Sequence, residues 1–375
     1  MTRMFGVRRV LAGVGVGALV GSLALFGSPL LGSAQAAPGK AAKTGASATK
    51  VYTFVLSNNF LGNDFRPQME RLAQLTAALS PFKGVVKFRI VNSASTTQAQ
   101  IADLNNIVTT KPSAILIDAG DPTALNPTIA RACAAGIKVV TFDNPATAPC
   151  AWKVQENMYL GQVAIGQWMA KSLKGTGGVF VDRGLAGAPV SAEIENGFLK
   201  GLHTYGPKIK VLGYYTGGYA IGPEEAGVTS LLAGYPNVAG VHTQGYCTPI
   251  FKAFKEAGKP IVPTTCYGYN GEMVSCVQMK ASCAILSGSP EVVQIAMKLA
   301  LDAVEGQPTP ATSQVQPVPM TLYFTGPTVA LTNPGVNIAR VVLGKNAFPN
   351  LPPGLALPFT LPQYNITPVE AAGKQ

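Results

Sequence analysis

The chain has 375 residues, a formal net charge of +11 and only 13% charged residues. Its lysines and arginines are scattered, without the basic runs, aromatic platform or zinc module of nucleic-acid-binding proteins, so a nucleic-acid partner is not expected. The length predicts two domains rather than one.

The first 36 residues have the pattern of a secretory signal peptide. Three arginines precede an apolar run at 10–26, and Ala34-Gln35-Ala36 precedes Ala37. The run is shorter than the ~20 residues that span a bilayer, so we expect cleavage after Ala36 and a periplasmic or secreted protein. Cleavage removes the three arginines and lowers the net charge from +11 to +8. The leader fits the general export route, and the pair Arg8-Arg9 leaves twin-arginine export as the alternative.

Residues 37–50 contain mainly Ala, Gly, Ser, Thr and Lys without periodicity, which predicts a flexible tail. From residue 51 onward, short runs rich in Val and Ile alternate with segments of helical spacing. This pattern is typical of parallel strands covered on both faces by helices. The predicted strands are 51–56, 85–91, 114–117 and 137–142, with a helix at 66–79 and helical spacing around Leu104 and Ile129.

A second set of the same kind begins after Cys150, so the sequence predicts two similar doubly wound α/β lobes. Its expected helices are 160–173, 190–205, 223–235 and 248–257, and its expected strands are 179–182, 209–215, 238–243 and 260–264. A further helix is expected at 290–305 and a further strand at 321–324. The region after residue 327 is rich in proline and predicts loops on the surface.

Polar residues follow the predicted strands, where open parallel sheets bind ligands. Asn59, Phe60 and Phe65 in the first loop offer amide groups and stacking faces, although the phenylalanines equally suit packing of the helix on its sheet. Asp121 is either a ligand contact or the cap of a helix that starts at Pro122. Asp143 and Asn144 lie near an expected crossover and are stronger ligand candidates.

No enzyme signature is present, because the sequence lacks a Walker lysine loop, a nucleophile elbow and a zinc-binding His-Glu-x-x-His helix. The two histidines, His203 and His242, fit structural roles better than that of a general base. We therefore expect a binding protein without catalytic residues, cofactor or metal.

Six cysteines lie beyond the leader, and an even number in an exported chain favours disulfides. Their spacing suggests pairing between neighbours, with buried free thiols as the alternative. The expected pairs are Cys133 with Cys150, Cys247 with Cys266, and Cys276 with Cys283.

Several stretches together resemble the type I periplasmic binding proteins, the ribose-binding-like solute receptors of ABC importers. They are SNNF, QAQIADLNNIVTTKPSAILID, AGIKVVTFDN, NGFLKGL and VVQIAMKLALDAVEGQP. The resemblance implies two lobes joined by three crossovers, near 145–153, 286–290 and 314–320, with hinge closure on a ligand in the cleft. The implied boundaries are 51–147 plus 288–316 for the N-terminal lobe, 148–287 plus 317–332 for the C-terminal lobe, and 333–375 for a C-terminal extension.

The sequence departs from the sugar-binding pattern of that family at several positions. Ile194 stands where relatives usually carry an arginine, and Gln244 and Tyr267 lie in loops where relatives carry Asn-Asp and Gly-Phe-Asp. Tyr219 matches an aromatic position of the family. The resemblance therefore implies a less charged and more aromatic pocket, with Tyr219, Gln244 and Tyr267 as ligand contacts from the second lobe.

These observations predict an exported, monomeric receptor that delivers a small molecule to an ABC permease in the inner membrane. The expected ligand is a sugar or polyol, or a less polar or aromatic compound. One alternative is a receptor that presents an autoinducer or sugar to a membrane sensor. Others are a secreted hydrolase built on Asp143, Glu193 and Asp182, and an adhesive surface protein.

Overall fold

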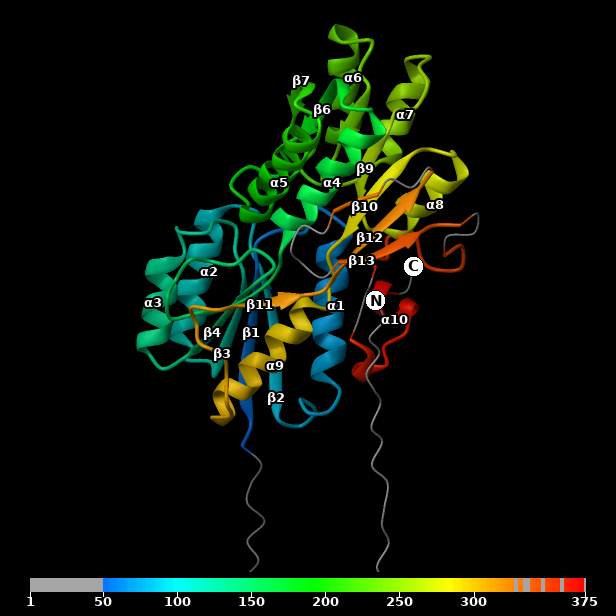
Figure 1. Cartoon of the computed structure of the whole chain (residues 1–375). Coiled ribbons are helices and arrows are strands. Elements are labelled where there is room, and N and C mark those ends of the chain that lie inside the picture. Colours follow the sequence, from blue (N-terminus) through cyan, green and yellow to red (C-terminus); the bar gives the residue numbers. More distant parts are fainter. Residues whose placement is uncertain (1–49, 327–329, 333–337, 345–347, 358–360, 374–375) are drawn as a thin grey trace, which may run out of the picture. The chain divides into compact units, whose positions relative to one another are not determined.

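The computed structural model describes residues 50–326, 330–332, 338–344, 348–357 and 361–373 (Figure 1). The expected signal peptide at 1–36 and residues 37–49 of the expected tail lie outside the described residues. None of the helices in the described ranges has the length and apolar character needed to cross a bilayer.

The first sheet has six strands among the described residues, in the order β11-β5-β4-β3-β1-β2, and each pair is parallel. β3 and most of β1 are buried, which explains their continuous apolar sequences. The strands are β1 (Tyr52–Asn58), β2 (Val86–Asn92), β3 (Ala114–Asp118), β4 (Lys138–Phe142), β5 (Trp152–Glu156) and β11 (Val315–Val318). The helices of this half are α1 (Phe65–Ala77), α2 (Thr97–Thr109), α3 (Asn126–Ala134) and α9 (Val292–Glu305).

The second sheet has seven strands within the described ranges, in the order β13-β12-β10-β9-β8-β6-β7. Its strands are parallel except where β12 runs antiparallel to β10. They are β6 (Thr176–Asp182), β7 (Lys208–Tyr215), β8 (Gly240–His242), β9 (Thr264–Tyr267), β10 (Cys283–Ser287), β12 (Met320–Thr325) and β13 (Ile338–Val342). The helices of this half are α4 (Met158–Ser172), α5 (Pro189–Tyr205), α6 (Ile221–Gly234), α7 (Thr248–Glu256) and α8 (Asn270–Gln278).

Both sheets repeat one topology. β2-β1-β3-β4-β5 and β7-β6-β8-β9-β10 have the same order, which is one of the two common orders of doubly wound folds. In such folds ligands bind beyond the carboxyl ends of the strands, near the point where the order reverses. The predicted pair of similar α/β lobes is therefore confirmed.

The chain crosses between the sheets at three places: Asn157 between β5 and α4, residues 288–291 between β10 and α9, and Pro319 between β11 and β12. The second and third overlap the crossovers implied by the sequence, although the expected boundary after residue 316 divides β11. The first lies later than 145–153, because residues 152–156 form β5 and pair with β4 in the first sheet. The expected boundary at residue 148 thus assigned a strand of the first sheet to the second half.

The second half also differs from expectation in detail. The strand expected at 260–264 begins only at Thr264, as β9, because Pro260 and Pro263 have no N–H group to donate to a neighbouring strand. The helix α8 and the short strand β11 were not predicted.

The sequence predicted surface loops for the C-terminal region, and this prediction is incomplete. Residues 338–342 form β13, residues 368–372 form α10 (Pro368–Ala372) against α1, and a 3-10 turn lies at Pro362–Tyr364 (Figure 1). Leu355, Leu357 and Ile366 are buried in the same apolar cluster as residues of α1 and α9. The region therefore contributes to the core.

The three expected disulfides are confirmed: Cys133–Cys150, Cys247–Cys266 and Cys276–Cys283. The first joins the end of α3 to the segment before β5. The other two lie side by side in the second half, with the Sγ atoms of Cys247 and Cys276 3.5 Å apart.

Candidate functional site

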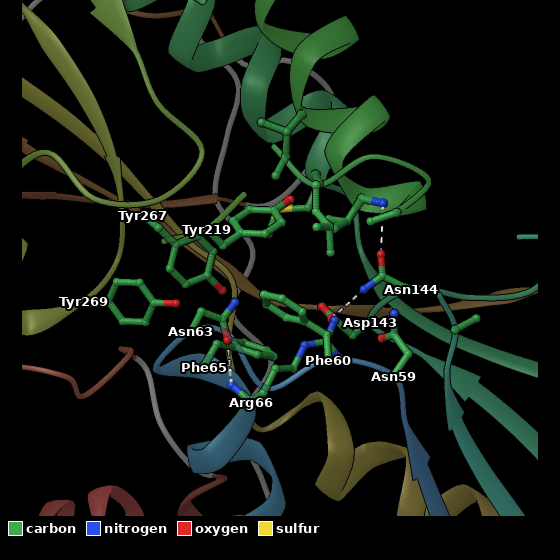
Figure 2. Close-up of a pocket in the computed structure, with 16 residues that line it drawn as sticks. Asn59, Phe60, Asn63, Phe65, Arg66, Asp143, Asn144, Tyr219, Tyr267 and Tyr269 are labelled. Atoms are coloured by element: carbon green, nitrogen blue, oxygen red, sulfur yellow. Dashed lines mark hydrogen bonds and ion pairs between the residues drawn. The ribbon is translucent and has the colours of Figure 1, made fainter. Parts of the chain in front are cut away.

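A pocket that is partly open to solvent lies between loops that follow strands of the two sheets (Figure 2). The lining residues from the first half are Asn59, Phe60, Asn63, Phe65, Arg66, Ala119, Asp143 and Asn144. Those from the second half are Met158, Leu185, Ala188, Val190, Ile194, Tyr219, Tyr267 and Tyr269.

Arg66 is the one basic residue among those that line the pocket, and it lies in the first turn of α1. Its guanidinium group forms ion pairs with Asp118 at the end of β3 and, at 3.0 Å, with Asp143 Oδ2 after β4. All three residues are buried. Burial raises the pKa of Asp143, and the charge of Arg66 opposes that shift.

Asn144 uses its side-chain amide to connect the two halves. Its Nδ2 group donates to Asp118 Oδ1 at 3.1 Å and to Asp143 Oδ2 at 3.0 Å. Its Oδ1 atom accepts the backbone N–H of Val190, in the first turn of α5, at 3.1 Å. Asn144 therefore helps to hold α5 against the first sheet.

The loop after β1 is held by Asn58, whose Nδ2 group donates to the carbonyl of Phe60 at 2.9 Å and to Glu70 Oε1 at 2.7 Å. These bonds place Asn59 and Phe60 at the pocket. Asn59 Oδ1 is buried and has no hydrogen-bond partner among the described residues. A buried acceptor of this kind is suited to a ligand donor.

Tyr219 belongs to a network of the second half. Its hydroxyl group donates to Gln244 Oε1 at 3.0 Å and lies 2.7 Å from Ser191 Oγ. Beneath it, Asp182 accepts the backbone N–H groups of Gly184, Gly217 and Gln244. The network fixes the tyrosine ring at the pocket wall.

Three aromatic residues form one edge of the pocket. The rings of Phe65 and Tyr267 meet edge to face at a centroid distance of 6.1 Å, and those of Tyr267 and Tyr269 lie 5.1 Å apart. The Tyr267 hydroxyl donates to the carbonyl of Gly288 in the second crossover at 3.0 Å. Figure 2 shows the labelled tyrosines on one side of the pocket and Asp143, Asn144 and Asn59 on the other.

Two pocket residues that are not glycine have a left-handed backbone conformation. Asp143 and Tyr219 both have φ of +57°. Such residues cost free energy unless their surroundings hold them, and they often occur at ligand sites. Here the ion pair with Arg66 and the network around Gln244 hold the two residues.

Seven of the nine residues named from the sequence line this pocket: Asn59, Phe60, Phe65, Asp143, Asn144, Tyr219 and Tyr267. Asp121 does not. Its Oδ1 atom accepts the N–H groups of Thr123 and Ala124 in the turn before α3, and these bonds lower its pKa. The helix expected to start at Pro122 begins at Asn126, so Asp121 stabilises a turn and does not cap that helix. Gln244 lies behind the wall, where it supports Tyr219.

The sequence analysis missed Arg66, Asn63 and Tyr269 as pocket residues. The position of Arg66 in the sequence could have indicated its role. A cation in the first turn of a helix is unfavourable unless a nearby anion compensates its charge. Asn63 and Tyr269 gave no signal beyond their places in polar loops. Ile194, noted as a departure from the family pattern, lies at the pocket and is 2% exposed.

The arrangement offers binding groups rather than a catalytic pair. His242 is buried against Phe198, and burial lowers its pKa to about 3, so it remains neutral. Glu193 accepts a hydrogen bond from Gln155 at 2.8 Å, and burial raises its pKa. In the described part of the chain, the cluster with metal-ligand geometry consists of four cysteines that are paired in disulfides.

Residues 54–308, more than half of the chain, match the family model described as a periplasmic binding protein domain. No curated protein matches the sequence. The crystal structure of an ABC transporter solute binding protein from Thermobispora bispora is similar at 29% identity and a TM-score of 0.64, over 69% of this chain and 82% of that chain.

Two further similar structures show the same fold at lower identity. An ABC transporter periplasmic solute binding protein from Actinobacillus succinogenes with bound D-allose is 21% identical, with a TM-score of 0.61 over 72% of this chain and 96% of that chain. A glucose-galactose binding protein from Geobacillus stearothermophilus is 18% identical, with a TM-score of 0.64 over 73% and 97%. These similar structures are those of solute-binding proteins and not of enzymes.

Proposed function

Because the chain belongs to the family of periplasmic binding protein domains, we propose that it is an exported receptor that captures a small molecule between two lobes and delivers it to an ABC permease. The ligand class that we propose at this level is a sugar, a polyol or a related less polar compound. The observation that carries the proposal is the pocket between the strand ends of two repeated sheets.

The lobes that we propose follow the crossovers. The first contains residues 50–156 and 292–318, and the second contains 158–287, 320–326 and 338–342. Three short connections between two bodies permit hinge rotation. A ligand that contacts both bodies favours the closed arrangement, because only that arrangement makes both sets of contacts.

Side chains from the proposed lobes meet around the pocket, which supports a closed arrangement in this structure. Besides the bond between Asn144 and Val190, Gln155 donates to Glu193 at 2.8 Å and Tyr246 donates to Asp64 at 3.2 Å. Phe65 also contacts Tyr267 across the same boundary.

We propose direct ligand contacts for Asn59, Phe60, Phe65, Asp143, Tyr219 and Tyr267. Both bonds to Asp143 given above use Oδ2, which leaves Oδ1 as an acceptor for a ligand donor. Asn144 acts mainly on Asp143 and on α5, since its own polar atoms have protein partners.

The test is a thermal-shift screen of the mature chain against sugars, polyols and small aromatic compounds, followed by titration calorimetry on each hit. A ligand that binds the folded state raises the melting temperature. Asp143→Ala should abolish the shift of a true ligand, whereas Asp121→Ala, outside the pocket, should preserve it. Absence of any hit in all three classes, or a hit unaffected by Asp143→Ala, would contradict the proposal.

A further inference from the structure

The two walls of the pocket have different chemical character. The first lobe contributes the charged and amide side chains, including Arg66, Asp143 and Asn59. The second lobe contributes Met158, Leu185, Ala188, Val190 and Ile194, whose side chains have no hydrogen-bond donor, together with three tyrosines. A ligand between the walls therefore meets charged and amide groups on one side, and aliphatic side chains and tyrosine rings on the other.

Two of the three tyrosine hydroxyl groups in the second wall already donate to partners within the protein. Tyr219 uses its single proton in the bond to Gln244, and Tyr267 uses its proton in the bond to the Gly288 carbonyl. A phenol has one proton to donate. These two residues can therefore offer ring surface to a ligand, but can donate a hydrogen bond only by breaking a bond within the protein.

The first wall is arranged to accept hydrogen bonds and does not favour an anionic ligand. The positive charge of Arg66 is compensated by Asp118 and Asp143, so the pocket has no excess of positive charge for a carboxylate or a phosphate. Asn59 Oδ1 lacks a partner among the described residues, and Asp143 Oδ1 is not used by the bonds to Arg66 and Asn144. Both atoms are acceptors, which calls for hydroxyl or N–H donors.

We infer that the pocket binds a neutral amphiphilic solute, a sugar or polyol ring that donates to Asn59 and Asp143 and carries an aryl or alkyl group against α5. This inference rests on the proposed function and narrows its ligand class to alkyl or aryl glycosides. A free sugar has hydroxyl groups around its whole rim, and those that face Val190 and Ile194 lose water without gaining a partner. Each such hydroxyl lowers affinity by roughly tenfold.

The test compares free D-glucose and D-galactose with their methyl and phenyl β-glycosides by titration calorimetry on the mature chain. We expect at least one phenyl glycoside to bind about tenfold or more tightly than its parent sugar. Ile194→Gln places an amide in the apolar wall. It should reduce the ratio of the affinity for the phenyl glycoside to the affinity for its parent sugar about tenfold. Ile221→Gln, at an exposed position of α6, is the matched control and should leave the ratio unchanged.

Leu185→Asn provides a second variant in case Ile194→Gln does not fold, because Leu185 is only partly buried at the pocket rim. A reduced ratio for this variant supports the inference. Free sugars that bind as tightly as their glycosides would overturn it while leaving the receptor function intact. Binding of neither series would also overturn it, and the broader screen described above then decides the proposed function separately.

Discussion

The side-chain oxygen of Asn144 accepts the backbone N–H of Val190 at 3.1 Å, which joins the end of β4 to the first turn of α5. The same amide donates to Asp118 and Asp143. One side chain thus links the second half of the molecule to the ion pairs of Arg66.

Replacement of Asn144 by alanine should weaken ligand binding about tenfold without unfolding the protein, because the closed arrangement loses one hydrogen bond and Asp143 loses a donor. Titration calorimetry with a ligand from the screen measures the change. Asn126→Ala removes a half-buried amide that bonds Thr147 outside the pocket and serves as the control. Equal affinities of the two variants would show that the bond to Val190 has no role in closure.

Replacement of Arg66 by methionine should lower the free energy of unfolding by about 3–5 kcal/mol, because Asp118 and Asp143 then lose their shared cation in a buried site. Urea unfolding measures this change. Arg131→Met, at an exposed arginine of α3, should have little effect. The double variant with Asp118→Asn should recover part of the loss, and no recovery would argue against the ion pair as its cause.

Glu156 should make stability fall as pH rises. Burial and the nearby Asp143 raise its pKa to about 8 from 4.5, so the folded chain keeps a proton that the unfolded chain has lost between these values. The free energy of unfolding should therefore decrease with pH in this window, by at most about 1.4 kcal/mol per unit, and level off above it. Urea unfolding of Glu156→Gln should show a smaller slope, whereas Glu305→Gln, at an exposed residue, should not change it.

Removal of the first disulfide by Cys133→Ala and Cys150→Ala together should lower the free energy of unfolding by about 2–4 kcal/mol, because the link closes a loop across a separation of 17 residues. Ligand affinity should remain near that of the parent chain, since neither cysteine lines the pocket. A large loss of affinity in a folded variant would contradict this separation of roles.

Replacement of Leu355 by alanine should lower the free energy of unfolding by about 2–5 kcal/mol, since this side chain is fully buried in the cluster that contains α1 and α9. Val369→Ala changes a side chain that is 61% exposed and should cost within about 0.5 kcal/mol. If the two variants were equally stable, the C-terminal region would not be part of the core in solution.

The repeated sheets were predictable because parallel strands that are buried on both faces have continuous apolar sequences, as in β3 and β4. The crossover at Asn157 was misplaced because β5 reads Trp-Lys-Val-Gln-Glu, with alternating exposure and no apolar run. Short strands of this kind gain their stability from neighbours that the local sequence does not reveal. The C-terminal strand β13 escaped prediction for the same reason, as most of its residues are exposed.

The pocket was predictable where a side chain directly follows a strand, as for Asp143 and Asn144. Arg66 was missed because its role depends on Asp118 and Asp143, which lie more than 50 positions away in the sequence. Gln244 follows a strand but turns toward Ser191 and Tyr219. Local patterns locate the edge of a sheet, whereas side-chain direction depends on tertiary partners.

The segment around Ala356 bonds to both halves of the molecule. Its backbone N–H and carbonyl bond to the side chain of Gln68 in α1, while the neighbouring Leu355 and Leu357 bond to the backbone of Asn270 and Gly268 beside Tyr269. Any motion that separated the halves beside Tyr269 would have to break these bonds, so we expect an opening that keeps them to pivot about this segment.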